Sequence, residues 1–166
     1  MGIETYRRIA EFGKKLMLYD NIESTLPAIS EEAKAIINVE RCSIFMVDRT
    51  ANMVWTKLSD GIGRIALGLD AGIVGLCATS AKPQVSNNPY EDGRFLAKID
   101  EKSGFVTRNI LAVPIFNSKQ TVIGVIQLLN KYNGDFTESD EGIMEFFANY
   151  ISGTLELALL MEENKK

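Results

Sequence analysis

Apolar residues recur at helical spacing near both ends of the chain, whereas its middle alternates short apolar runs with turns. Residues 3–18 and 22–37 place apolar side chains three or four positions apart, which predicts two helices. Pro27 lies too far inside the second of them to be a first-turn proline, so a late start or a kink is expected. A third apolar stripe predicts a final helix from about Glu138 to Met161.

Runs rich in β-branched and aliphatic residues predict strands in the middle of the chain. They are residues 41–48, 53–58, 64–69, 108–116 and 121–129. The first run is apolar at successive positions, which is typical of a central strand buried on both faces. The last two runs are joined by four residues and therefore predict a hairpin.

The segment between the third and fourth predicted strands is mixed. Residues 70–82 are small and apolar, and Asp70 is placed to cap them, which predicts a short helix. Residues 83–105 are polar and irregular, with a helix expected near 92–101. Hairpins flanked by helices at both ends predict an α+β fold, in which helices pack on an antiparallel sheet.

Composition narrows the class of protein. The chain has 166 residues, of which 46% are hydrophobic and 24% charged, as in an ordinary soluble globular domain. Its net charge of −4 argues against nucleic acid and anionic membranes as partners. No run approaches 18 consecutive apolar residues, so we expect no membrane contact by this segment and a cytoplasmic location.

Histidine is absent, which removes Ser-His and Cys-His nucleophilic systems and most zinc sites. The two cysteines, Cys42 and Cys77, are too few for a disulfide framework and are not spaced as metal ligands. Both lie in apolar segments, where buried thiols are usually inert. We therefore expect no metal, no catalytic residue and no enzyme activity.

Residues 130–142, with the sequence NKYNGDFTESDEG, connect the last predicted strand to the last predicted helix. Thr137 and Asp140 have capping-box spacing. Lys131 is close enough in sequence to pair with Asp140, and we expect Phe136 to reach the core. A structural role explains this stretch better than direct ligand contact.

Two polar residues stand inside apolar strand segments. Gln127 lies among Val, Ile and Leu, and Ser43 lies between Cys42 and Ile44. A buried polar side chain needs a hydrogen-bond partner. That partner is either a neighbouring group or a ligand, and the residues alone leave both readings open.

The order of elements and three motifs resemble a GAF domain over nearly the whole chain. The motifs are GIVGLCATSAKP, GFVTRNILAVPIF and VIGVIQLLNK. The most specific resemblance is to the NKFDE signature of GAF domains in cyclic-nucleotide phosphodiesterases and some adenylyl cyclases. Its positions here are Asn130, Lys131, Phe136, Asp140 and Glu141. The resemblance implies an antiparallel sheet of five or six strands, terminal helices on one face and a ligand pocket on the other.

The resemblance also implies a set of ligand-binding residues. They are Ser43, Asp60, Ile73, Val74, Asp100, Ser103, Thr107 and Gln127. Ser43 and Gln127 match the pocket floor, and backbone N–H groups at Ile73 and Val74 suit a phosphate. The departures are Ser59, where an aromatic residue that stacks on the base is expected, and Leu96, where a tyrosine is expected.

The expected function is that of a sensory module within a larger signalling protein. It requires no cofactor, and a cyclic nucleotide is one candidate among small ligands. We expect a single domain over 1–166, with terminal helices at 1–19 and 138–163 in a homodimer bundle. The linked effector would be a chemotaxis signalling domain, kinase, cyclase or phosphodiesterase. The alternatives are a ligand-free structural dimerisation module and, less favoured, an enzyme of the methionine sulfoxide reductase type.

Overall fold

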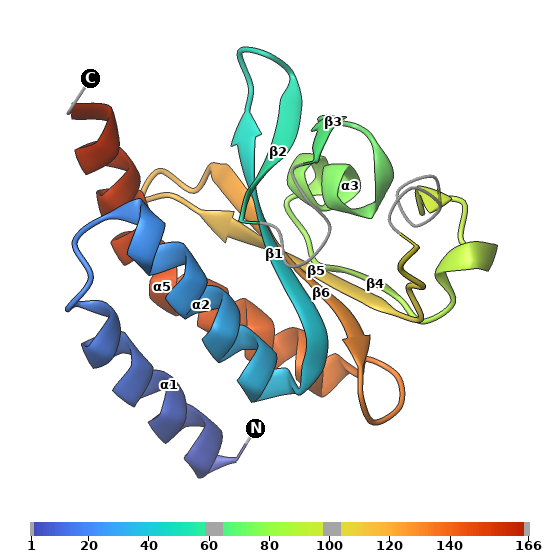
Figure 1. Cartoon of the computed structure of the whole chain (residues 1–166), viewed down its shortest axis with the longest axis horizontal. Coiled ribbons are helices and arrows are strands. Elements are labelled where there is room, and N and C mark those ends of the chain that lie inside the picture. Colours follow the sequence, from blue (N-terminus) through green and yellow to red (C-terminus); the bar gives the residue numbers. More distant parts are fainter. Residues whose placement is uncertain (1, 59–64, 98–103, 165–166) are drawn as a thin grey trace.

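A six-stranded antiparallel sheet with the order β3-β2-β1-β6-β5-β4 forms the centre of the molecule (Figure 1). The structure is a computed structural model that describes residues 2–58, 65–97 and 104–164. The strands are β1 Val39–Asp48, β2 Met53–Leu58, β3 Ala66–Gly68, β4 Gln84–Ser86, β5 Ile110–Phe116 and β6 Val122–Lys131. All five neighbouring pairs are antiparallel, which confirms the predicted α+β class.

The helices divide between the two faces of this sheet (Figure 1). One face is covered by α2 (Ile22–Ile37) and α5 (Glu138–Asn164), with α1 (Ile3–Leu16) packed against both. The other face carries the shorter α3 (Gly72–Ser80). A single 3-10 turn, Pro89–Glu91, follows β4. The terminal helices therefore leave the α3 face of the sheet free to form a site.

Strand β1 supplies side chains to the hydrophobic cores on both faces. Ile44 and Met46 pack among α1, α2 and α5, whereas Phe45 points to the core beneath α3. Alternate residues of a strand point to opposite faces, so a central strand with a core on each side must be apolar throughout. The predicted central position of this strand is confirmed, since β1 pairs with both β2 and β6.

The structure excludes a late start of α2, and the predicted N-cap of α3 is wrong. Helix α2 begins at Ile22, ahead of Pro27, because the Asn21 side chain accepts the Ser24 N–H at 2.9 Å and caps the helix there. Helix α3 begins one residue later than predicted, so its N-cap is Ala71 rather than Asp70. Gly72 adopts a left-handed φ of 69°, a conformation that glycine tolerates, and the chain turns into the helix at that point.

The segment predicted as irregular contains a strand that the sequence pattern missed. Strand β4 has only three residues, too few for a visible alternation. Residues 92–96 are not helical, and most of the remaining predicted helix lies outside the described residues. The Asp92 carboxylate accepts the Arg94 backbone N–H at 2.9 Å, a local bond that competes with helix formation.

Strand β5 contains a proline that pairs with only one neighbour. Pro114 lies opposite Val125 of β6. The pairing between β4 and β5 extends no further along β5 than Ala112, which lies opposite Gln84. Because proline has no N–H to donate, it fits where a second neighbouring strand is missing.

Helix α5 is the one helix in the described part of the chain that is long and apolar enough to cross a membrane. Length and composition alone support this, and a core helix passes the same test. The apolar side chains of Met144, Phe147 and Ile151 are buried against the sheet and its neighbouring helices. Only 33% of the most apolar window of this helix is buried inside the molecule, and the absence of membrane contact stays a prediction.

Candidate ligand pocket

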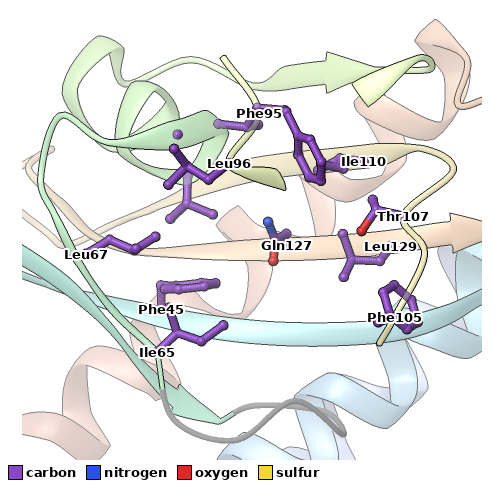
Figure 2. A pocket seen from close by; sticks show the side chains of 13 residues that line it. Phe45, Ile65, Leu67, Phe95, Leu96, Phe105, Thr107, Ile110, Gln127 and Leu129 are labelled. Atoms are coloured by element: carbon purple, nitrogen blue, oxygen red, sulfur yellow. The ribbon is translucent and has the colours of Figure 1, made fainter. Parts of the chain in front are cut away.

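A partly open, mostly apolar pocket lies between α3 and the sheet (Figure 2). Residues from β1, β5 and β6 form its floor, and the start of α3 forms one wall. Residues in and just before β3, residues after the 3-10 turn, and residues ahead of β5 complete it. The lining consists of Phe45, Ile65, Leu67, Gly72, Ile73, Val74, Phe95, Leu96, Phe105, Thr107, Ile110, Gln127 and Leu129. No charged side chain is among these described residues. We call this space the inner pocket.

Gln127 is the polar group most open to the inner pocket. It lies opposite Ser43 of β1 and Ala112 of β5, in the middle of the sheet. Its side chain projects from β6 toward the centre of the lining, between Phe45 and Leu129 in the view of Figure 2. Within the residues that the structure describes, its amide makes no hydrogen bond to another side chain or to the backbone. The amide therefore offers both a donor and an acceptor to a ligand.

The first turn of α3 adds backbone donors to the same pocket. Its first hydrogen bond runs from the Gly75 N–H to the Ala71 carbonyl at 3.0 Å. The N–H groups of Gly72, Ile73 and Val74 precede that bond, so no carbonyl of the helix satisfies them. Alanine at the N-cap has no side-chain oxygen to cap them. Such a helix start favours an anionic or carbonyl group.

Leu96 closes the pocket over this helix start. Its Cδ1 atom lies 3.0 Å from where a Cβ on Gly72 would stand, so glycine is required there for close approach as well as for its positive φ. The space in the pocket amounts to about 50 Å³. Pockets that bind drug-sized molecules have about 300–1,000 Å³. In this conformation the inner pocket has room for only a few water-sized molecules, and a nucleotide would require the wall to move.

The structure brings together four of the eight predicted ligand-binding residues. Ile73, Val74, Thr107 and Gln127 line the inner pocket. Ser43 lies on the same face of the sheet but is not part of the lining, because Phe45 and Gln127 fill that region of the floor. The remaining predicted ligand-binding residues lie outside the described residues, as does Ser59. They are Asp60, Asp100 and Ser103.

Three aromatic residues of the lining were not predicted from the sequence. Phe45 follows Ser43 by two positions and so shares its face of β1, a signal that the alternation of the strand contained. Phe95 and Phe105 come from segments without regular structure, where no periodicity indicates which side chains point inward. These rings can stack on a planar ligand. They could thus partly replace the aromatic residues that the resemblance implies at the positions of Ser59 and Leu96.

The residues of the NKFDE-like signature lie outside the inner pocket and tie β6 to α5. Lys131 Nζ donates to Asp140 Oδ2 at 2.6 Å, as the sequence predicted. The capping box is present, since the Asp140 N–H donates to Thr137 Oγ1 and the Thr137 N–H to Asp140 Oδ2. Phe136 is buried in the core, also as predicted. Glu141 donates its backbone N–H to the Thr137 carbonyl in the first turn of α5.

Asn130 is the most heavily hydrogen-bonded residue of this signature, and it is 1% exposed with a left-handed φ of 62°. Its Oδ1 accepts the Arg108 N–H at 2.6 Å. Its Nδ2 donates to the Val106 carbonyl at 2.9 Å and to Glu40 Oε2 at 3.0 Å. One amide thus fixes the segment that precedes β5 against the start of β1.

Both cysteines are buried, and neither forms a disulfide bond. Cys77 lies in the core between α3 and the sheet, and burial raises the pKa of its thiol to about 12. A thiol of this kind is almost entirely protonated at neutral pH, and only the thiolate is a good nucleophile. Among the described residues, no group of histidine, cysteine and acidic side chains could hold a metal ion.

Comparisons with known proteins agree with this geometry. Residues 21–155 match the family described as GAF domain. A probable 3′,5′-cyclic phosphodiesterase of Caenorhabditis elegans is 29% identical over 160 residues, which are 88% of this chain and 22% of that protein. A dual 3′,5′-cyclic-AMP and -GMP phosphodiesterase of Drosophila melanogaster is 48% identical over 81 residues, 48% of this chain and 6% of that protein. The chain thus spans about a fifth or less of these relatives.

Solved structures share the fold at lower identity. The GAF domain of an Acinetobacter phosphoenolpyruvate-protein phosphotransferase superposes with a TM-score of 0.82 at 20% identity, covering 98% of this chain and 99% of that one. A free methionine-R-sulfoxide reductase of Neisseria meningitidis gives 0.76 at 13% identity, covering 97% and 95%. The family match covers most of the chain, and the sheet, the terminal helices and the pocket fit it, so the chain belongs to the GAF domain family.

Proposed function

We propose that this GAF domain is a ligand-sensing regulatory module of a larger cytoplasmic signalling protein. The observation that carries the proposal is the Gln127 amide, which projects into an apolar pocket without a partner among the described residues. An unused donor and acceptor in such surroundings cost free energy unless water or a ligand satisfies them. The ligand would be small and planar, with a cyclic nucleotide as the first candidate.

The lining supports this class of ligand. Phe45, Phe95 and Phe105 provide aromatic surface for a base, and Gln127 can pair with its hydrogen-bonding edge. The N–H groups at the start of α3 can receive the phosphate. Binding would displace Leu96 and its neighbours, because about 50 Å³ is too small for a nucleotide. That displacement would be coupled to the terminal helices as a shift between two conformations.

Isothermal titration calorimetry with cyclic AMP, cyclic GMP and the corresponding nucleosides tests the proposal. Heat and a rise in melting temperature with one of them are the expected results. The Gln127→Leu variant keeps the side-chain size and removes the amide, and it should weaken binding about tenfold. Gln120→Leu makes the same chemical change on an exposed loop residue and should leave binding unchanged. If no compound gives either heat or a rise in melting temperature, these ligands are excluded.

The small volume of the inner pocket favours a second candidate, a ligand-free structural module that holds two copies of the parent protein together. In that case the titrations give no heat while the protein still dimerises. The terminal helices would form the contact in either case, and the effector joined to them would be a chemotaxis domain, kinase, cyclase or phosphodiesterase. Sedimentation velocity separates this candidate from a monomeric domain.

We propose that the domain is not an enzyme and requires no cofactor. The raised pKa of Cys77, about 12, and the burial of Cys42 support this proposal against a reductase-type mechanism with a reactive cysteine. An assay with free methionine sulfoxide and a reductant tests it directly. Turnover that disappears in Cys77→Ser would overturn the proposal.

A further inference from the structure

A second cavity lies outside the inner pocket and shares one wall with it. Phe105 lines both spaces. The second space, which we call the outer cavity, measures about 360 Å³ and is bordered by Glu40 and Arg41 of β1, by Val106 and Arg108 ahead of β5, and by Asn130. Its lining is polar and charged, whereas the inner pocket has no charged side chain among its described residues.

Two guanidinium groups border the outer cavity without an acidic partner in the described ranges. Arg41 lies over the Phe105 ring, with Cζ 3.9 Å from the ring centroid. Arg108 is exposed, and neither arginine forms an ion pair with a described residue. Pairing is common for arginines elsewhere in the chain, where Arg7, Arg8 and Arg94 all contact carboxylates. The outer cavity thus carries unused guanidinium donors on a chain of net charge −4.

The backbone that carries both arginines is held firmly. Arg41 lies within β1 and pairs with Leu129 of β6. The backbone N–H of Arg108 donates to Asn130 Oδ1 at 2.6 Å, so the start of its side chain is fixed at the edge of the cavity. The third charged residue, Glu40, places a carboxylate there, and its Oε2 accepts from Asn130 Nδ2 at 3.0 Å. Among the described residues of the lining, two positive charges and one negative charge leave an excess of one positive charge.

We propose that the outer cavity is an anion site in which Arg41 and Arg108 bind a phosphate or carboxylate group. The planar guanidinium matches these anions with two parallel N–H donors, and its stacking on Phe105 orients it. The anion has two sources: it is free in solution, or it is the charged end of a ligand that passes Phe105 into the inner pocket. In the second case the start of α3 receives a carbonyl oxygen of the ligand instead of its phosphate. Only the second source rests on the function proposed above.

NMR of ¹⁵N-labelled protein tests the site, because each arginine Nε–H group gives its own signal. Inorganic phosphate should shift the signals of Arg41 and Arg108 selectively, and high salt should reverse the shift. Arg41→Gln and Arg108→Gln should each weaken phosphate binding about tenfold. Glu40→Gln removes the opposing charge and should strengthen it several-fold. Arg49→Gln, whose guanidinium contacts the Val122 carbonyl at the far end of β6, should change nothing.

The source of the anion follows from two further titrations. A cyclic nucleotide that shifts both arginine signals more strongly than phosphate, while its nucleoside does not, identifies the charged end of the ligand. If phosphate shifts the two arginine signals but no nucleotide changes any signal, the site binds free anions and the inner pocket does not bind nucleotide. Uniform shifts of all arginine signals, or wild-type phosphate affinity in both arginine variants, would overturn the anion site. Nucleotide binding that leaves both signals unmoved excludes the charged end of the nucleotide as the source of the anion, while supporting the function of the inner pocket.

Discussion

Lys131 and Asp140 form a short ion pair at the junction of β6 and α5, with Nζ 2.6 Å from Oδ2. The same carboxylate oxygen accepts the Thr137 N–H at 2.9 Å, so one atom serves both the ion pair and the helix cap. The two side chains are only 16% and 12% exposed. Breaking this ion pair should therefore cost more stability than breaking a pair at the surface.

Asp140→Ala should therefore lower the free energy of unfolding by about 2–4 kcal/mol, because it removes the cap and leaves the Lys131 ammonium unpaired. Lys131→Met should cost less, since the carboxylate keeps the Thr137 N–H. Urea denaturation measures both, with exposed Glu138→Gln as the control in the same helix turn. Equal stability of Asp140→Ala and the control would show that the junction contributes nothing.

Asn130→Asp should destabilise the fold although it changes one atom. The new carboxylate oxygen would face the Val106 carbonyl and Glu40 Oε2, both of which accept hydrogen bonds from the present amide. We expect a loss of about 3 kcal/mol or more, the range for uncompensated buried polar groups. Adding Glu40→Gln should recover part of this loss, and a double-mutant cycle measures the coupling. Strict additivity of the two substitutions would contradict the contact between these side chains.

The Asp92–Arg94 pair predicts a pH dependence. Hydrogen bonds from the Arg94 guanidinium, with Nε at 2.9 Å and 3.1 Å from the two carboxylate oxygens, hold the pKa of Asp92 well below its usual range. Because the pKa of Asp92 is lower in the folded protein, its carboxylate stabilises the fold at any pH above its pKa in the unfolded chain, about 3.9. This stabilisation is lost as the pH falls toward the pKa of Asp92 in the folded protein. The stability difference between wild type and Asp92→Asn should be constant from pH 5 to 7 and shrink below about pH 4. Urea midpoints across this range measure it.

The Cys77 thiol should resist alkylation in the folded protein. With a pKa of about 12, the thiolate fraction at pH 8 is about one in ten thousand, against about a quarter for a free cysteine. Iodoacetamide followed by peptide mass spectrometry should show modification of Cys77 only after denaturant is added. Rapid labelling of the native protein would contradict the buried environment that raises this pKa.

An exposed aromatic patch on α1 and α5 is the surface that we propose for the dimer contact. Tyr6 contacts Phe146 edge to face at 5.3 Å between ring centroids, and Phe146 and Tyr150 remain 41% and 48% exposed. Phe146→Ser should weaken self-association about tenfold or more if this patch is the contact. Tyr132→Ser, in an exposed turn away from these helices, provides the control. Sedimentation velocity over a concentration series gives the dissociation constants.

The long helices and strands were predictable because their apolar residues recur at the spacing that the geometry of a helix or a strand imposes. Strand β2 was predicted at Met53–Leu58, as the structure has it. The apolar stripe over residues 22–37 coincides with α2, although a late start or a kink at Pro27 was expected there. Strand β4 was not predicted, because three residues carry too little pattern. The Lys131–Asp140 pair followed from capping chemistry, which is local in sequence.

The inner pocket was predictable only in part. Gln127 stood out as a polar residue in an apolar strand, and the alternation of β6 places it on the pocket face. Phe95 and Phe105 did not, because contacts between irregular segments and a sheet arise from tertiary packing. The small volume is likewise a property of how Leu96 meets Gly72, residues separated by β4 and most of α3 in the sequence.

Pro114 affects the tendency of this domain to aggregate at high concentration. Beyond Ala112, β5 has no partner strand on its β4 side among the described residues, and such an open edge favours pairing with a strand of another molecule. The proline ring interrupts the row of N–H donors at that edge. Pro114→Val would restore a continuous β-branched and aliphatic run from Ile110 to Ile115, and with it a template for aggregation. The residue thus protects the protein in solution rather than contributing to its ligand chemistry.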